Sequence, residues 1–557
     1  MSYNPSNPLI VQSDRTILLE TASEKFEEAR DALSIFAELV KSPEHIHTYR
    51  VTPLSLWNAA ALGHTPEQIK AQLEAYTKYA LPSNLLVDID DFVSRYGRLK
   101  LVAEDDVLYL VSEDEALLEE VARQRQVQRY LLERVGPRRF RVDREQRGFI
   151  KHALIRVGFP VEDLAGYVPG APLEIAVRNP TLGGKEFGLR EYQKEAVGAF
   201  WAGGTTQGGS GTIVLPCGAG KTIVAIGTMD VVKSHTLILT TNITALRQWR
   251  DEIIDKTDID PDMIGEYSGE RKEIKPITIT TYQILTYRKN KNSEFVHFDV
   301  FNRGAWGLII YDEVHLLPAP VFRAVANLQS RRRLGLTATL VREDGKEEEV
   351  FSLIGPKKYD VPWRVLEKQG FIATATCSEI RVPFADEDLR LEYALSEQRQ
   401  KYRVAATNPR KLEVLTRLLE THKNDQVLVI GQYLDQLDEI AALVQAPIIT
   451  GRTPQAEREV LYEKFRRGEV PVLVVSKVAN FAVDLPDANV AIQVSGTFGS
   501  RQEEAQRLGR ILRPKKECNE AHFYSIVTRD TTEQEYSNKR QLFLTEQGYR
   551  YQIETVI

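Results

Sequence analysis

A chain of 557 residues exceeds what one hydrophobic core can organise, so the sequence predicts three or four domains. Its content of 43% hydrophobic and 27% charged residues is typical of globular proteins and excludes disordered and fibrous classes. The formal charge of −6 excludes the overall positive field of a passive nucleic-acid binder.

The sequence shows no pattern typical of a secretory signal, a membrane span or a cysteine metal site. The start, "MSYNPSNPLIVQSD", lacks the basic and apolar regions of a secretory signal, and no uncharged run approaches the roughly 20 residues of a membrane span. Cys217, Cys377 and Cys518 form no CxxC pair. We therefore expect no structural metal, no disulfide framework and no membrane segment, and a cytoplasmic location.

Residues 1–120 predict a small helical module. Thr52-Pro53 and Thr65-Pro66 each predict a helix start, because threonine caps the helix and proline fits its first turn. A third helix is expected from Leu85, followed by a hairpin in "GRLKLVAEDDVLYLVSED". This order resembles a winged helix, for which DNA binding and protein docking are equally open.

Residues 121–180 predict a small α+β domain, with a strand near Phe140 to Val142 and a helix through "REQRGFIKHALIRVG". Prolines and glycines near residue 180 indicate its end. The basic clusters "GPRRFRVDREQR", "RRR" at Arg331 to Arg333 and "LRPKK" are either solvated faces or local binding sites.

Apolar runs alternating with helical patterns predict two α/β domains with parallel sheets, at residues 181–360 and 408–557. The segment between them, 361–407, is charged and helical in period, and we interpret it as a linker with an insertion.

The stretch "VLPCGAGKT" predicts a phosphate-binding loop between a strand and a helix. Glycines allow backbone N–H groups to converge on phosphate oxygens, and the helix N-terminus adds its positive end. Lys221 would reach the β- and γ-phosphates and Thr222 would bind Mg²⁺. The residues expected to hold nucleotide here are Gly218, Ala219, Gly220, Lys221 and Thr222.

Two further motifs complete the predicted ATP site. "LIIYDEVH" ends an apolar strand with Asp312, suited to the Mg²⁺ shell, and Glu313, suited to polarising a water molecule. "EEAQRLGRILRPKK" offers Arg507, Arg510 and Arg513, which either meet the γ-phosphate when the two domains close or form a solvated basic face. Nucleotide hydrolysis is therefore the leading hypothesis.

In chain order, "LREYQ", "GAGKT", "DEVH", "TAT" and "QRLGRILR" resemble the motif series of superfamily 2 helicases. With "LPCGAGKT", "REDG" and the tail "FYSIVTRDTTEQEYSNKRQLFLTEQGY", the chain resembles more narrowly a bacterial or archaeal-type member of the XPB helicase/translocase family. The likeness covers residue 180 to the end strongly and the earlier part more weakly. It implies two tandem RecA-like helicase domains, a damage-recognition domain at 121–180 and a thumb insertion near 385–407.

The resemblance also implies residue roles. Arg190 and Gln193 would lie at the adenine, and Gln506 with Arg510 and Arg513 would complete the ATP site. The residues implied to couple nucleotide to DNA, or to contact the DNA backbone, are His315, Thr337, Thr339, Thr241, Thr280, Thr281 and Asp484. A chain without an overall positive charge could still hold DNA if amides, hydroxyls and a few cations contacted the DNA backbone.

The stretch "LGLTATLVREDG" alone predicts only a strand and a surface turn. By resemblance, Arg342, Glu343 and Asp344 form the RED motif, implied to aid strand separation. The chain departs from the family at "SKVANFAVDLP", where Ala479, Asn480 and Phe481 precede the retained Asp484 and a glycine and an acid are missing. We expect ATPase activity to survive this change better than unwinding.

The sequence thus predicts an ATP- and Mg²⁺-dependent DNA helicase or translocase, with 3′→5′ polarity by resemblance, acting in DNA repair on forked, single- or double-stranded DNA. Two alternatives stay open: a duplex translocase or annealing motor without strand separation, and an ATP-gated DNA clamp that recruits a nuclease. The family implies a nuclease partner in archaea and a transcription–repair complex in eukaryotes.

Overall fold

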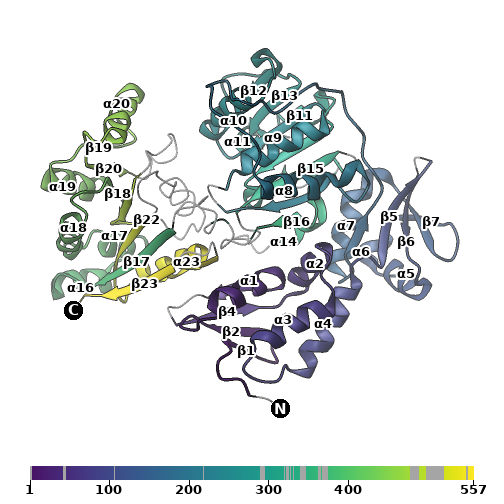
Figure 1. Cartoon of the computed structure of the whole chain (residues 1–557), viewed down its shortest axis with the longest axis horizontal. Coiled ribbons are helices and arrows are strands. Elements are labelled where there is room, and N and C mark those ends of the chain that lie inside the picture. Colours follow the sequence, from purple (N-terminus) through teal and green to yellow (C-terminus); the bar gives the residue numbers. More distant parts are fainter. Residues whose placement is uncertain are drawn as a thin grey trace.

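The structure is a computed structural model of the whole chain. It describes residues 3–41, 45–105, 107–216, 219–288, 295–318, 320–321, 325–326, 328–329, 331–338, 347–361, 366, 374–476, 488–496, 520–546 and 550–556. Figure 1 shows an N-terminal unit (3–96) at the bottom, a second unit (97–167) at the right, a first α/β domain (168–361) at the top and a second α/β domain (374–556) at the left. Within these ranges no helix is long and apolar enough to cross a membrane.

The N-terminal unit combines a small antiparallel sheet with four helices. The sheet order is β1-β2-β4-β3, and the elements are β1 (Leu9–Val11), β2 (Thr16–Glu20), α1 (Phe26–Phe36), β3 (Glu38–Lys41), β4 (Ile46–Arg50), α2 (Pro53–Ala61), α3 (Pro66–Tyr76) and α4 (Ser83–Arg95). The predicted starts at Thr52-Pro53 and Thr65-Pro66 are confirmed, since both threonines cap their helices through the third backbone N–H. The sheet itself was not predicted.

The second unit is a five-stranded sheet with helices on it. Its order is β7-β8-β6-β5-β9, and its elements are β5 (Leu99–Glu104), β6 (Val107–Val111), α5 (Glu115–Ala122), α6 (Arg125–Gln128), β7 (Leu131–Arg134), β8 (Arg139–Val142), η1 (Arg144–Gln146), α7 (Arg147–Arg156) and β9 (Val161–Asp163). The hairpin β5–β6 pairs with β8 and β9 and shares their hydrophobic core, whereas residues 9–93 form a separate core. The boundary expected at residue 120 therefore lies near residue 97, and the hairpin does not belong to the helical module.

The first α/β domain is built on a seven-stranded parallel sheet of order β12-β13-β11-β14-β15-β10-β16. Its strands are β10 (Ser210–Val214), β11 (Thr236–Thr240), β12 (Ile264–Tyr267), β13 (Ile277–Thr281), β14 (Leu308–Asp312), β15 (Arg332–Thr337) and β16 (Lys357–Asp360). Its helices and turns are α8 (Glu191–Trp201), η2 (Ala202–Gly204), α9 (Lys221–Val232), α10 (Ile243–Lys256), η3 (Pro261–Met263), α11 (Tyr282–Leu285), α12 (Val300–Arg303), η4 (Val314–Leu316), α14 (Glu347–Glu349) and the π-helical turn η5 (Val350–Ile354). The central strands are buried on both faces, as continuous apolar runs predict.

The start of the first α/β domain differs from the expected residue 181. Leu173 and Ile175 are buried in its hydrophobic core. Isolated bridges also join Pro172 to Ser234 and Val177 to Thr257. The segment before residue 180 therefore packs on this domain rather than on the second unit.

The second α/β domain has a seven-stranded parallel sheet of order β19-β20-β18-β21-β22-β17-β23. Its strands are β17 (Thr374–Val382), β18 (Val427–Gly431), β19 (Ile448–Ile449), β20 (Val472–Ser476), β21 (Val490–Gln493), β22 (Glu520–Thr528) and β23 (Arg550–Thr555), and its helices are α16 (Glu387–Leu395), α17 (Gln398–Ala406), α18 (Arg410–Thr421), α19 (Leu434–Val444), α20 (Gln455–Arg466) and α23 (Thr532–Glu546). β17 lies inside the segment 361–407 expected to be a linker, so this domain begins by residue 374 rather than at 408. The helical character predicted for 385–407 is confirmed by α16 and α17.

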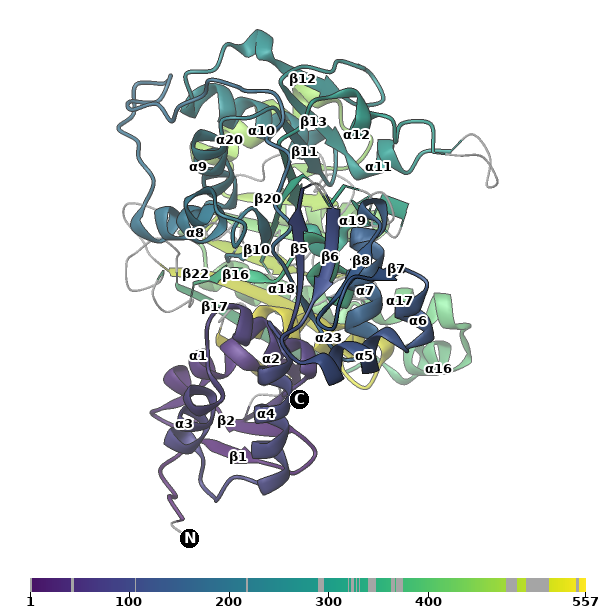
Figure 2. The same cartoon turned by 90° about the vertical axis from the view of Figure 1, so that its right-hand side faces the viewer.

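The N-terminal unit docks on the edge of the first α/β sheet, and the two views agree on this arrangement (Figures 1 and 2). The backbone N–H of Lys357 in β16 donates to Asn58 Oδ1 at 3.0 Å. Trp57 of α2, Ile155 of α7 and Phe351 of η5 form one buried apolar cluster. The N-terminal unit and the second unit therefore both contact the first α/β domain at the π-helical turn η5.

Candidate functional site

The phosphate-binding loop lies at the carboxyl end of β10. Gly220 adopts a left-handed conformation with φ +81° and is followed by Lys221 at the start of α9. A Cβ atom at Gly220 would lie 2.5 Å from Gln193 Nε2, so both the backbone angle and the space require glycine. The strand, loop and helix predicted from "VLPCGAGKT" are thus present in the described part of the motif.

The acidic motif lies at the same edge of the sheet, at the end of the central strand β14. Asp312 ends this strand, and Glu313 adopts the left-handed region with φ 48° and ψ 56°, which is rare for a residue with a side chain. Lys221 Nζ lies 3.5 Å from Glu313 Oε1, and both side chains are mostly buried. The structure therefore brings Lys221 and the acidic pair together, as the two motifs predicted.

The electrostatics of the acidic pair fit a divalent cation. Burial, and then the charge of Glu313, raise the pKa of Asp312 to about 6 despite the nearby Lys221 and a hydrogen bond from Trp249. The pair thus carries more negative charge than its surroundings neutralise. A hard dication with oxygen ligands would stabilise both carboxylates, so Asp312, with Thr222 from the first turn of α9, is a suitable Mg²⁺ site.

Gln193 and Tyr192 of α8 hold the phosphate loop from the side. Gln193 Nε2 donates to the Ala219 carbonyl at 3.1 Å, its Oε1 accepts from the Arg190 N–H at 2.9 Å, and Tyr192 Oη donates to the same Ala219 carbonyl at 2.6 Å. Arg190 is exposed, and its Nη1 lies 3.3 Å from Tyr192 Oη. Both ends of the Gln193 amide are therefore engaged with protein groups in this arrangement.

His315 and Thr337 connect the acidic motif to the end of β15. His315 Nδ1 lies 2.6 Å from Thr337 Oγ1 and 3.6 Å from Glu313 Oε2. His315 is 5% exposed and Thr337 is fully buried. The structure thus joins two residues that are 22 positions apart and that the resemblance assigned to one coupling role.

The threonines expected at the DNA backbone differ in exposure. Thr241 follows β11 and is partly exposed, and Thr281 is 6% exposed and caps α11. Thr280 has a fully buried side chain within β13. The Thr280 and Thr281 side chains are therefore buried here, which leaves Thr241 as the accessible member.

Three arginines of the basic cluster, in β8 and directly before it, form surface ion pairs. Arg138, Arg139 and Arg141 pair with Glu113, Glu104 and Glu133 at 2.7, 2.9 and 3.0 Å. These surface ion pairs favour the solvated face, one of the two alternatives left open by the sequence.

Several predicted site residues lie outside the described residues. They are Gly218 of the loop, Thr339, the RED residues Arg342, Glu343 and Asp344, the altered motif Ala479, Asn480 and Phe481 with Asp484, and Gln506, Arg507, Arg510 and Arg513.

Sequence reasoning missed two aromatic residues that hold Asp312. Trp249 Nε1 donates to Asp312 Oδ2 at 2.9 Å, and Tyr282 Oη donates to the Asp312 carbonyl at 2.8 Å. Both lie in segments quoted for DNA contact, "TTNITALRQW" and "TTYQ". No local pattern identifies them, because each contacts a strand at least 30 positions away.

Comparisons with known proteins agree with this arrangement. A model described as ERCC3/RAD25/XPB C-terminal helicase matches residues 366–557, one described as type III restriction enzyme, res subunit, matches residues 186–342, and one described as helicase conserved C-terminal domain matches residues 9–136. The first two matches each cover one of the parallel-sheet domains.

Curated relatives span the whole chain. It is 54% identical over 545 residues to the DNA 3′-5′ helicase XPB of Mycobacterium tuberculosis, covering 98% of this chain and 97% of that protein. It is 53% identical to the DNA 3′-5′ helicase XPB of Kineococcus radiotolerans, covering 98% and 96%. A subunit named general transcription and DNA repair factor IIH helicase/translocase subunit XPB, from Encephalitozoon cuniculi, is 34% identical, covering 99% and 83%. With a phosphate loop, an acidic pair, two parallel-sheet domains and more than 50% identity to two XPB helicases over nearly their whole length, the chain belongs to the XPB family of helicases.

Proposed function

We propose that the chain is an ATP-dependent 3′→5′ DNA helicase or translocase that acts in DNA repair. The observation that carries the proposal is the contact of Lys221 Nζ with Glu313 Oε1 at 3.5 Å, beside Asp312 at the same sheet edge. A lysine, a water-activating carboxylate and a metal-binding carboxylate are the groups that phosphoryl transfer to water requires. DNA as substrate, the polarity and the repair role rest on the names of the relatives.

The geometry supports an exchange of partners when ATP binds. Lys221 would move its ammonium from Glu313 to the β- and γ-phosphates, which carry more negative charge. Glu313 would then accept a proton from the attacking water as the γ-phosphorus–oxygen bond to ADP breaks. Asp312 and Thr222 would hold Mg²⁺, which neutralises charge on the phosphates.

Coupling to DNA would use the hydrogen bond between His315 and Thr337. His315 contacts Glu313 at one end of the link, and Thr337 ends β15 at the other. A change in the position of Glu313 during hydrolysis would therefore reach β15 directly. Gln506, Arg510 and Arg513 would approach the γ-phosphate from the second α/β domain and link hydrolysis to domain closure.

Replacement of the phosphate-loop lysine tests the site. We expect Lys221→Ala to reduce DNA-stimulated ATP hydrolysis to background, because it removes the ammonium group that contacts Glu313 and would reach the phosphates. Lys233→Ala, directly after the far end of α9, is the matched control, since Lys233 Nζ lies 3.9 Å from the exposed Glu174. Hydrolysis retained by the Lys221 variant would contradict the assignment.

Strand separation is tested independently of hydrolysis. Displacement of a labelled strand from forked DNA reports unwinding, and displacement of a triplex-forming strand reports translocation along duplex. A helicase displaces both, a duplex translocase displaces only the triplex strand, and a clamp displaces neither while its DNA binding depends on ATP.

The RED residues provide a second variant for this test. We expect alanine at Arg342, Glu343 and Asp344 to preserve ATP hydrolysis and weaken displacement from forked DNA. Equal loss of both activities would mean that these residues serve the fold.

A further inference from the structure

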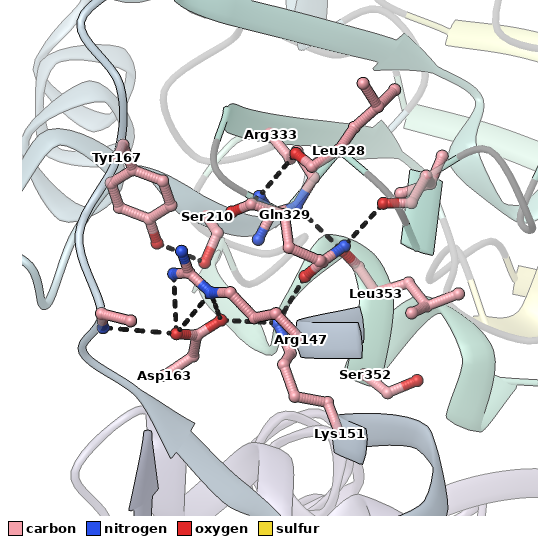
Figure 3. Close-up of polar contacts among 12 residues, drawn as sticks. Arg147, Lys151, Asp163, Tyr167, Ser210, Leu328, Gln329, Arg333, Ser352 and Leu353 are labelled. Carbon is pink, nitrogen blue, oxygen red and sulfur yellow. Dashed lines mark hydrogen bonds and ion pairs between the residues drawn. The ribbon is translucent and has the colours of Figure 1, made fainter. Parts of the chain in front are cut away.

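A cluster of buried charged residues lies where the second unit meets the first α/β domain, far from the residues that would contact ATP. Arg147 and Lys151 come from α7, Asp163 ends β9, and Arg333 lies at the start of β15 (Figure 3). Arg147, Lys151 and Arg333 are 5%, 4% and 0% exposed. Burying four charged side chains is unfavourable unless they are well paired, so their placement calls for a specific role.

Asp163 is the centre of the ion pairs. Arg147 donates to it from Nε at 3.1 Å and from Nη2 at 2.7 Å, and Lys151 Nζ donates to its Oδ2 at 2.8 Å. Burial opposes ionisation of Asp163, but the charges of Arg147 and Lys151 outweigh it and hold the pKa of this carboxyl well below its usual range. Asp163 therefore stays charged and holds the end of β9 against α7.

Lys151 extends the cluster across the boundary between the two units. Its Nζ also donates to Gln329 Oε1 at 2.7 Å, and Gln329 Nε2 donates to the Leu353 carbonyl at 2.9 Å. Arg333 binds that carbonyl through Nε at 2.8 Å, and its Nη1 donates to the Gln329 carbonyl at 2.7 Å. One chain of hydrogen bonds thus runs from Asp163 to the start of β15.

Tyr167 makes a second link across the same boundary. Its Oη donates to Ser210 Oγ at 2.9 Å, and Ser210 is the first residue of β10. The guanidinium groups of Arg147 and Arg333 lie 5.6 and 5.8 Å from the centre of its ring. Figure 3 shows the Tyr167 ring beside the Arg147 guanidinium, with its hydroxyl toward Ser210.

The two contacted strands lead directly to the ATP site. Ser210 is paired with Arg333 at the start of β10 and β15, and Val214 is paired with Thr337 at their ends. Four residues of strand correspond to about 13 Å. β10 then continues to the phosphate loop, and Thr337 holds His315, so a displacement at the cluster is transmitted along two rigid strands.

We propose that Lys151, Asp163 and Arg333 are positioning residues that hold the second unit in one position on β10 and β15 and so set how strongly DNA stimulates ATP hydrolysis. The proposal rests on the proposed function. Apolar packing tolerates sliding, whereas the Arg333 guanidinium holds the Leu353 and Gln329 carbonyls in a fixed fork, and the Gln329 side chain in turn accepts from Lys151 of the second unit. We therefore expect the second unit and the first α/β domain to move together as one rigid body.

Lys151→Met is the sharpest test, because it removes the bond to Gln329 while leaving Asp163 paired with Arg147. ATP hydrolysis of the full chain is measured with and without forked DNA. We expect the DNA-independent rate and the KM for ATP to change by less than about twofold, and the stimulation by DNA to fall on the order of tenfold. Hydrogen exchange should become faster in residues 147–167.

Further variants separate positioning from folding. Arg333→Lys keeps the charge but loses the fork, so it should lower DNA stimulation as Lys151→Met does. Glu162→Gln is the matched control, since Glu162 precedes Asp163 on β9 and its carboxylate lies 4.0 Å from Lys100 of the same unit. The conservative variant Lys151→Arg, which retains a donor toward Gln329, should recover part of the stimulation.

The outcomes distinguish this inference from the proposed function. DNA stimulation equal to that of the unmodified protein in both Lys151→Met and Arg333→Lys would overturn the positioning role, even if exchange in 147–167 became faster. Loss of the DNA-independent rate in all cluster variants would mean that the cluster serves folding only. An unmodified protein without DNA-stimulated hydrolysis would refute the proposed function and the inference together.

Discussion

His315 Nδ1 lies 2.6 Å from Thr337 Oγ1. This contact joins the turn η4, which follows the central strand β14, to the end of the neighbouring strand β15. The distance is that of a strong hydrogen bond between buried groups. Because Glu313 also lies 3.6 Å from His315, the imidazole contacts the carboxylate expected to activate water and the strand expected to respond. The link is short enough to transmit a small movement without an intervening side chain.

Removal of the Thr337 hydroxyl should uncouple hydrolysis from movement. We expect Thr337→Val, which keeps the shape of the side chain, to lower strand displacement on the order of tenfold more than ATP hydrolysis. The measurement is the number of ATP molecules hydrolysed per strand displaced. Thr337→Ser keeps the hydroxyl and should behave nearly as the unmodified protein; a parallel loss in both variants would argue against the hydrogen bond.

Trp249 should tune the affinity of the site for Mg²⁺. Trp249→Phe removes the indole N–H that donates to Asp312 Oδ2, and residues behind a metal ligand typically change metal affinity about tenfold or more. We expect the Mg²⁺ concentration for half-maximal ATP hydrolysis to rise roughly tenfold. Trp306→Phe is the control, since Trp306 is buried in the same domain and donates to the Val300 carbonyl. An unchanged Mg²⁺ requirement would exclude this role.

The buried pair of Lys411 and Glu533 should stabilise the second α/β domain. Lys411 Nζ donates to the two carboxylate oxygens at 2.7 and 2.8 Å, and both side chains are 1% exposed. Lys411→Met leaves Glu533 buried without its cation and should cost about 3–5 kcal/mol of unfolding free energy, seen by calorimetry. The double variant with Glu533→Gln should recover much of this loss.

An exposed pair in the same domain provides the comparison. Arg417 and Glu554 are 51% and 57% exposed, so Arg417→Met should change stability by less than about 1 kcal/mol. Equal destabilisation by Arg417→Met and Lys411→Met would show that burial is not the cause.

His47 should make the N-terminal unit sensitive to acid. Burial, and then repulsion from Arg30, lower the pKa of His47 to about 4 in the folded chain. Below its ordinary pKa near 6.5 the unfolded state binds a proton that the folded state does not, so stability falls as pH falls from about 6.5 to about 4. At pH 5 the loss is about 2 kcal/mol.

Hydrogen exchange of β2 and β4 at pH 7 and pH 5 measures this effect. His47→Gln removes the titrating group, so the local stability of its N-terminal unit should depend less on pH than that of the unmodified protein. His45→Gln, two residues away on an exposed position, is the matched control. The same pH dependence in the His47 variant and the unmodified protein would contradict the assignment.

Local motifs were predictable because the residues that determine each one are neighbours in the sequence. The phosphate loop needs glycine at residue 220, and an acidic pair that ends an apolar strand can be recognised from its neighbours alone. The helix starts at Thr52 and Thr65 were predictable for the same reason. Each depends on contacts within four residues.

Long-range pairing was not predictable. The sequence alone groups the hairpin β5–β6 with the helices before it, because its partners, β8 and β9, follow later in the chain. β17 was interpreted as linker because its sequence, "TATCSEIRV", is not an apolar run, although it lies between β22 and β23. Arg333 belonged to a run that suggested a solvated face, yet it is fully buried, since carbonyls from distant segments accept its hydrogen bonds.

The pairing of β23 with β17 has a practical consequence for handling the protein. β23 covers one side of β17, a nine-residue strand whose other side is paired with β22. Truncation before residue 550 would leave that side of β17 with unpaired N–H and C=O groups, which attract strands from other molecules. Shortened versions of the chain should therefore self-associate, and a solubility screen of end-trimmed variants should favour those that keep residues 550–555.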